Sequence, residues 1–239
     1  MDMIDIHCHL IPKVDDGAEN FRMTQKMLYK SADDGVKAMV LTPHCRPELF
    51  HASSREIEVR FNKTREMAAK SGIDIDLYLG REFHSRSDTL DIIRKAPRYA
   101  LGCSRYILLE FSERHPYNRI RNQVYELTAA GYIPVIAHAE RYPCLCRNPE
   151  TFEELRSEGA LIQVNAGSVL GLDGWKVSAM CAKLLKKEWI DIIASDAHNM
   201  SARRPVMGEC AKFLEKKVSA RYAKRLLYDN AACIINEIK

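Results

Sequence analysis

The chain has 239 residues, of which 46% are hydrophobic and 28% charged, and its formal net charge is +4. This length suits one domain, residues 1–239, built around one sizeable core. Lys and Arg are scattered among nearly as many acids, so the sequence has no basic stripe of the kind that follows nucleic acid. We therefore expect no nucleic-acid partner.

The N-terminus has acids and a histidine where a signal peptide would have a basic start and an apolar run. No stretch approaches the roughly 20 apolar residues that span a bilayer. We expect a cytoplasmic protein without direct membrane insertion. Its eight cysteines are irregularly spaced, with no CxxC pair, and are expected to be free thiols.

Short apolar strands alternate with helices along the chain. Strands are expected at residues 4–6, 38–41, 77–79, 106–109, 134–137, 161–164 and 190–194. Helices are expected at about 21–32, 54–71 and 117–130, from Pro149 with Asn148 as N-cap, up to about Glu188, and at 204–217 and 219–228. This alternation predicts a parallel β/α architecture that is buried on both faces. The less regular residues 83–102 are expected to form a helix and a loop over the barrel mouth.

Residue types that bind metals follow six of the seven predicted strands. They are His7, His9, His44, Glu82, Glu110, His138, Asp196 and His198. A single histidine at a strand end is more often an ordinary polar side chain than a ligand. In a parallel β/α barrel, however, the C-terminal ends of the strands converge on one face, so these residues would meet there. Side chains alternate along a strand, so the pairs 7/9 and 196/198 would each point to one side.

Imidazole and carboxylate without thiolate suit Mn, Fe or Zn at a hydrolytic centre better than a structural zinc site. A carboxylate such as Glu82 can bridge two ions. A cluster of ions lowers the pKa of a shared water and holds the oxygens of an in-line displacement. The ligand types therefore indicate phosphoester hydrolysis.

Several motifs are found in this order: DIHCH at residues 5–9, DDG at 15–17, TPH at 42–44, HAERY at 138–142 and SDAHN at 195–199. Together with Glu82 and the Glu110-Phe111-Ser112 segment, they resemble the capsule-associated, manganese-dependent protein-tyrosine phosphatases of the PHP superfamily. The resemblance runs essentially end to end. It implies an α/β fold, a distorted (β/α)7 TIM-like barrel.

The resemblance also implies three divalent ions, with Mn favoured and Fe or Zn as alternatives. The first ion would take His7, His9, Glu82 and Asp196. The second would share Glu82 and take Glu110 and His138. The third would take Asp16, His44 and His198. Asp15 is adjacent to Asp16, and one loop could present either carboxylate.

Two arginines resemble the phosphate-binding pair of that family: Arg141, after His138, and Arg204, before Pro205. Arg203 could serve in place of Arg204. A guanidinium offers a planar fork of donors to phosphate oxygens. Asp196 and His198 are both candidates for supplying a proton to the leaving group. The sequence departs from the expected pattern around Glu82, which leaves the substrate's shape open.

The implied activity is dephosphorylation of a phosphotyrosine protein, the tail of a bacterial tyrosine kinase of capsule or exopolysaccharide synthesis. A phenolate leaving group has a pKa of about 10 and needs less protonation than an alkoxide. The rival enzymes are a histidinol-phosphate or other small-molecule phosphatase, and a PHP-type nuclease, which the absence of an additional nucleic-acid-binding domain disfavours. A kinase-binding regulator without catalysis is the non-enzyme alternative, against which the intact ligand set argues.

Overall fold

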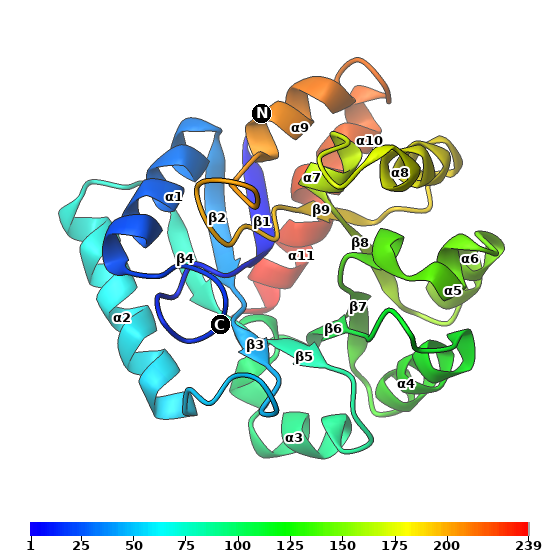
Figure 1. The fold of residues 1–239 in the computed structure, drawn as a ribbon, viewed down its shortest axis with the longest axis horizontal. Coiled ribbons are helices and arrows are strands. Elements are labelled where there is room, and N and C mark those ends of the chain that lie inside the picture. Colours follow the sequence, from blue (N-terminus) through cyan, green and yellow to red (C-terminus); the bar gives the residue numbers. More distant parts are fainter. Residues whose placement is uncertain (239) are drawn as a thin grey trace.

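A ring of parallel strands surrounded by helices forms the centre of the computed structural model, which describes residues 1–238 (Figure 1). The strands are β1 (Met3–Cys8), β2 (Val36–Leu41), β3 (His44–Cys45), β4 (Asp76–Leu79), β5 (Glu82–His84), β6 (Tyr106–Glu110), β7 (Ile133–Ile136), β8 (Leu161–Asn165) and β9 (Ile192–Ala194). β3 follows β2 after a two-residue break that contains Pro43. β5 follows β4 after another two-residue break, Gly80 and Arg81. The nine strands therefore correspond to the seven strand positions expected from the sequence.

Hydrogen bonds between neighbouring strands close the ring. One sheet has the order β1-β2-β4 and the other β3-β5-β6-β7-β8-β9, and every pair is parallel. The first and last strand positions meet at their C-terminal ends, where the His9 N–H donates to Ala197 O at 2.9 Å and the Asp196 N–H donates to His7 O at 2.8 Å. The expected distorted (β/α)7 barrel is confirmed.

Helices form the layer outside the strands. They are α1 (Phe21–Asp33), α2 (Ser54–Lys70), α3 (Thr89–Lys95), α4 (Tyr117–Ala129), α5 (Pro143–Cys146), α6 (Glu150–Ser157), α7 (Ala166–Val169), α8 (Trp175–Lys187), α9 (Met207–Leu214), α10 (Ala220–Lys224) and α11 (Asn230–Glu237). Side-chain caps fix some of the starts: Asn20 accepts a hydrogen bond from the Met23 N–H, and Ser53 accepts one from the Glu56 N–H. A π-helical turn, Arg225–Asp229, joins α10 to α11.

Two apolar clusters hold these layers together. The larger one lies between the strands and the outer helices. The smaller one fills the interior of the ring with side chains such as Ile4, Ile6, Val40 and Leu108. Ala231 and Ile234 of α11 belong to this interior cluster, so the last helix closes the ring at the N-terminal ends of the strands. The opposite end, where the strands finish, is left for the polar residues.

Some boundaries differ from those expected. Asn148 does not cap α6, which begins at Glu150 with Pro149 in the N-cap position. The helix expected at 204–217 is limited to α9. The helix expected at 219–228 instead continues through the π-helical turn into α11, because its apolar face is needed to cover the interior core.

Residues 83–102 do not cover the barrel mouth as expected. Leu90 and Ile93 of α3 are buried in the outer cluster, like the residues of the other connecting helices. Leu101 is buried in the interior cluster beside α11, at the far end from the mouth. Burial of these apolar side chains determines the path of this segment.

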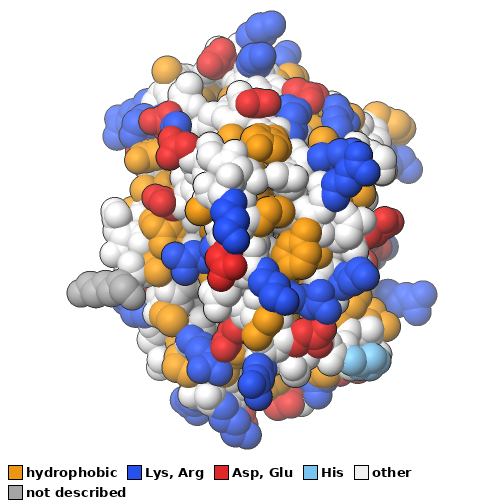
Figure 2. Space-filling model, turned by 90° about the vertical axis from the view of Figure 1, so that its left-hand side faces the viewer, with side chains coloured by type: hydrophobic (Ala, Val, Ile, Leu, Met, Phe, Trp, Pro, Cys, Tyr) orange, Lys and Arg blue, Asp and Glu red, His pale blue; other side chains and the backbone are white. Residues whose placement is uncertain are grey.

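The surface carries mixed charge. On the face over α1 and α2, Lys and Arg side chains are interspersed with acidic and apolar ones (Figure 2). Within residues 1–238, no helix combines the length and the apolar character that crossing a membrane requires.

Candidate metal centre

A bulge in β1 determines where its histidines point. Ile4 and Ile6 belong to the interior cluster, whereas Cys8 packs in the outer one. In a regular strand Ile6 and Cys8 would share a face. The register with β2 slips between Asp5 and Cys8, which is the signature of a β-bulge. Beyond the bulge His7 and His9 both face the centre of the ring, above Ile6.

The first group of side chains surrounds the Nε2 atoms of these two histidines. His7 Nε2 lies 3.4 Å from Glu82 Oε1 and 3.4 Å from Asp196 Oδ1. His9 Nε2 lies 3.3 Å from Glu82 Oε2 and 3.6 Å from Asp196 Oδ1. Donor atoms bound to one ion at about 2.1 Å stand roughly 3–3.5 Å apart. His7, His9 and Glu82 thus have donor atoms within 4.8 Å of one another, and Asp196 Oδ1 approaches both imidazoles.

The second group shares both Glu82 oxygens with the first. His138 Nε2 lies 3.0 Å from Glu82 Oε1, and His44 Nδ1 lies 2.8 Å from Glu82 Oε2. Glu110 Oε2 is 3.9 Å from His44 Nδ1 and 3.0 Å from His84 Nδ1. Glu110 is thus closer to His44 and His84 than the expected grouping with His138 implies.

The third group lies on the Asp16 side. Asp16 Oδ1 is 3.3 Å from His44 Nε2 and 3.4 Å from His198 Nε2. His9 has a donor atom within 4.8 Å of this group as well. The neighbouring Asp15 has a different position, because its Oδ2 accepts a hydrogen bond from His9 Nδ1 at 2.7 Å and another from the His44 N–H at 3.1 Å. Asp15 therefore orients two histidines, and Asp16 is the carboxylate that faces the imidazoles.

Because this cluster is buried, the charges within it determine the pKa values of its side chains. Burial alone would raise the pKa of the Glu82 carboxyl, but the His7 and His44 imidazoles hold that pKa well below its usual range. Burial also opposes a charge on His7, yet the Glu82 and Asp196 carboxylates outweigh it and raise the pKa of His7 to about 9. The carboxylates thus attract positive charge to the imidazole nitrogens, as they would attract a divalent cation.

Although His44 Nδ1 and Glu82 Oε2 lie 2.8 Å apart, neither atom forms a hydrogen bond within residues 1–238, and nor does the buried His198 Nε2. Such atoms are rare in folded proteins and call for a partner of another kind. Imidazole nitrogens and carboxylate oxygens are ligands of Mn, Fe and Zn. The residues present therefore fit divalent ions.

A second layer of polar side chains orients these residues. Gln163 Oε1 accepts hydrogen bonds from His7 Nδ1 at 3.0 Å and from the His138 N–H at 2.9 Å. The Asn165 side-chain amide donates to Asp196 Oδ2 at 2.7 Å, and the Gln163 amide donates to Asn165 Oδ1 at 2.9 Å. Both residues lie on β8, the one strand position without a candidate ligand. Their i, i+2 spacing in an otherwise apolar buried strand is the sequence signal that points to them.

Two of the ligand candidates have an uncommon backbone conformation. His138 has a φ of 34° and Asp196 a φ of 50°, both in the left-handed region. Non-glycine residues there cost roughly 1–3 kcal/mol each and cluster at functional sites. These strained turns direct both side chains into the mouth just after β7 and β9 end.

The arginines are arranged differently from the expected pair. Arg203 Nη2 lies 2.9 Å from Asp196 Oδ2, and Arg141 Nη1 lies 3.3 Å from the same oxygen. Arg204 instead pairs with Glu209 at 3.1 Å. The geometry thus favours Arg203 over Arg204 as the second guanidinium at the centre. The sequence could not distinguish them, because neighbouring residues in a loop point in different directions.

A cavity of about 220 Å³ opens onto these groups. Its lining includes Asp16, Phe50, Glu82, Arg141, Asp196 and Arg203. The Phe50 ring stacks on His44, with 5.0 Å between the ring centroids. The cavity therefore combines cationic groups for an anion with an aromatic face.

The whole chain is similar to proteins of known function. A sequence profile described as "Capsular polysaccharide synthesis, CpsB/CapC" matches residues 3–236. Tyrosine-protein phosphatase CpsB of Streptococcus pneumoniae is 33% identical over 238 residues, which are 98% of each chain. This chain belongs to the CpsB/CapC family.

Solved structures show the same relationship. One similar structure is that of YwqE from Bacillus subtilis and CpsB from Streptococcus pneumoniae, "unique metal-dependent tyrosine phosphatases". The TM-score is 0.91 and the sequence identity 29%, and the match covers 99% of this chain and 96% of that one. Histidinol phosphate phosphatase from Lactococcus lactis has a TM-score of 0.59 and 15% identity, over 90% of this chain and 93% of that one. The second likeness shows a shared fold alone.

Gly17 of the DDG motif packs directly on His9. A Cβ added there would lie 2.1 Å from His9 O and 2.6 Å from His9 Cβ. We predict that Gly17→Ala displaces His9 and lowers bound metal and turnover at least tenfold, while the fold survives. Metal analysis and steady-state kinetics on one preparation measure both effects.

Gly72→Ala is the matched control. Gly72 has a φ of 65° but open space around it, so the substitution brings only the roughly 1–2 kcal/mol cost of a left-handed residue, far from the mouth. It should reduce stability and leave metal content unchanged. Equal metal loading in Gly17→Ala and the wild type would contradict the role given to Gly17.

Proposed function

We propose that this chain is a metal-dependent protein-tyrosine phosphatase that holds three divalent ions, with manganese as the favoured metal. Its substrate is proposed to be a phosphotyrosine protein, the tail of a bacterial tyrosine kinase of capsule or exopolysaccharide synthesis. The observation that carries the proposal is the buried Glu82 carboxylate, with four imidazoles from three strand positions around it. Family membership over nearly the full length supports the choice of phosphotyrosine.

The proposed ligands remain those implied by the motifs. His7, His9, Glu82 and Asp196 would hold one ion, and Asp16, His44 and His198 another, in agreement with the distances between their donor atoms. Glu82, Glu110 and His138 would hold the third. When bound, the ions would supply an activated water and neutralise charge on the phosphoryl group.

The arginines would bind and orient the phosphoryl group. Arg141 and Arg203 both contact Asp196 Oδ2, while Arg141 Nη2 lies 3.3 Å from Asp173 and Arg203 Nη1 lies 3.5 Å from Asp16. The N–H groups that point elsewhere would bind phosphate oxygens. The Phe50 ring offers an apolar face to the substrate's aromatic ring. This combination favours an aryl phosphate over an alkyl one.

We propose that Asp196 and His198 act as metal ligands and not as proton donors. His198 Nδ1 lies 2.9 Å from the Asp196 backbone oxygen, which can only accept, so the proton sits on Nδ1 and the Nε2 lone pair faces Asp16. Asp196 accepts hydrogen bonds from Asn165 and Arg203, which favour its ionised form. Both residues therefore suit ligation better than proton donation, and a phenolate leaves without much protonation.

Metal removal and substrate choice together test the proposed function. Chelator-treated protein should lose activity, and manganese should restore it. The reconstituted protein should prefer a phosphotyrosine peptide over a phosphoserine peptide and over histidinol phosphate, measured as kcat/KM. A preference for histidinol phosphate, or full activity without stoichiometric metal, would overturn the proposal.

Glu82 provides a sharper test of the metal cluster. Because Glu82 touches imidazoles of all three groups, Glu82→Ala should lose most activity and at least one ion. Glu82→Gln keeps the size without the charge and should resemble the alanine variant if charge is what matters. Circular dichroism should show an intact fold in both.

Glu158→Ala serves as the control, since this carboxylate pairs with Arg121 at the surface, away from the mouth. It should change stability by under about 1 kcal/mol and leave turnover normal. Normal metal loading in Glu82→Ala would refute the bridging role.

The arginines can be ranked by single substitutions. Arg141→Ala and Arg203→Ala should each raise KM and weaken inhibition by phosphate roughly tenfold or more, because a charge-assisted hydrogen bond contributes about 1.5–3 kcal/mol. Arg204→Ala should remain close to the wild type. If Arg204→Ala were the impaired variant instead, the assignment of Arg203 would be wrong.

A further inference from the structure

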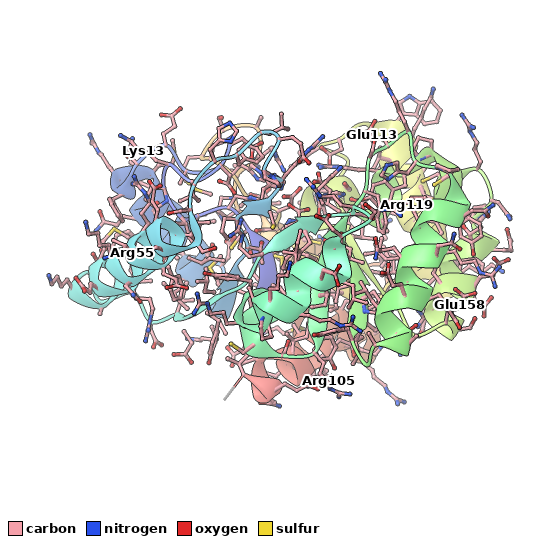
Figure 3. All side chains as sticks on the ribbon, turned by 90° about the horizontal axis from the view of Figure 1, so that it is seen from below. Lys13, Arg55, Arg105, Glu113, Arg119 and Glu158 are labelled. Atoms are coloured by element: carbon pink, nitrogen blue, oxygen red, sulfur yellow. The ribbon has the colours of Figure 1, made fainter. Side chains whose placement is uncertain are left out.

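A second, larger cavity of about 820 Å³ adjoins the metal cavity. The two share Glu113 and Arg141 in their linings. Glu113 follows β6 and lies at the mouth end of the molecule, opposite Arg105 and α11 (Figure 3). The rest of this groove is formed by α5, the residue after it and the first turns of α8, with Pro143, Arg147, Lys176, Val177 and Met180.

The volume of the groove indicates what kind of ligand it can hold. The metal cavity is smaller than the roughly 300–1,000 Å³ of ordinary ligand pockets, whereas the groove lies within that range. A phosphoprotein that places its phosphotyrosine at the metals must accommodate the chain on either side of that residue outside the metal cavity. The groove begins at Arg141, where such a chain would emerge.

Charge indicates the chemistry of the occupant. Asp173 is already paired with Arg141 at 3.3 Å and accepts a hydrogen bond from Ser168 at 2.6 Å. Glu140 is buried and accepts the Asn165 N–H. By contrast, Arg147 and Lys176 form no ion pair within residues 1–238, and both are exposed. Glu113, the remaining acid, stands at the boundary with the metal cavity.

Apolar side chains complete the groove. Val177 and Met180 lie one turn apart on α8 and are only partly buried. Trp175, at the start of the same helix, is 75% exposed. Lys176 Nζ lies 5.7 Å from the centroid of the Trp175 ring. An exposed tryptophan next to a lysine is typical of a surface that binds a partner.

We propose that this groove binds the segment next to the phosphotyrosine of the protein substrate, and that it selects acidic residues together with an apolar one. Arg147 and Lys176 attract the acids, and Val177 and Met180 pack against the apolar side chain. This inference rests on the proposed function. It adds a determinant of protein substrates that is separate from phosphate recognition.

Charge reversal in the groove tests it with three probes: a phosphotyrosine peptide with aspartates around the phosphotyrosine, the same peptide with lysines in their place, and p-nitrophenyl phosphate. Lys176→Glu should lower kcat/KM for the acidic peptide roughly three- to tenfold, through KM. It should raise kcat/KM for the lysine peptide and leave p-nitrophenyl phosphate unchanged. The difference should shrink at high ionic strength.

Two further variants complete the design. Arg147→Glu repeats the test from another element and should give the same pattern. Lys183→Glu is the matched control, since it makes the same charge change at an exposed position on α8 outside the groove. It should hydrolyse both peptides with the kcat/KM of the wild type.

The outcomes separate the two proposals. If the wild type hydrolyses the peptides but Lys176→Glu and Arg147→Glu change all three probes equally, or none of them, the groove is not a substrate site. If the metal-loaded wild type cleaves only p-nitrophenyl phosphate, the protein-phosphatase function itself fails, and the groove proposal fails with it.

Discussion

The interaction on which the rest of this structure depends is the one between the buried Glu82 carboxylate and the imidazoles around it. An ionised carboxylate removed from water costs many kcal/mol unless opposite charge and hydrogen bonds surround it. Here His7, His9, His44 and His138 lie within 3.4 Å of its oxygens. Each side chain comes from the end of a strand, so the charge is compensated only when the ring of strands is closed.

The contacts that close the ring of strands therefore also position the residues of the site. The backbone bonds that join the ends of the first and last strand positions involve His7, His9, Asp196 and Ala197, three of which are ligand candidates. The bulge in β1 and the left-handed turns at His138 and Asp196 then direct the side chains inward. Distortions that would weaken an ordinary barrel are located where the ligands need them.

Much of the fold and of the site could be predicted from the sequence. Apolar strand patterns located the seven strand positions, and metal-binding residue types at their ends located the mouth. The details that residue types leave open depend on three-dimensional direction. Neither the choice between Asp15 and Asp16 nor that between Arg203 and Arg204 is encoded in residue type, because neighbours in a loop share composition and differ only in orientation.

The predictions for the path of residues 83–102 and for the length of the last helix were wrong for a related reason. Leu101 and Ile234 look like ordinary apolar residues, and only the assembled ring shows that its open end needs to be covered. Gln163 and Asn165 were overlooked because amides in a buried strand are not metal ligands of a hydrolytic type. Their importance arises from what they touch.

The position of α11 has a consequence for biosynthesis. The interior of the ring is sealed by residues such as Ala231 and Ile234, which follow every strand in chain order. While β9 and α11 are still inside the ribosomal tunnel, the nascent chain has neither a closed ring nor a covered interior. Acquisition of metal would therefore follow the emergence of α11, and a chain without α11 would have an open, aggregation-prone barrel.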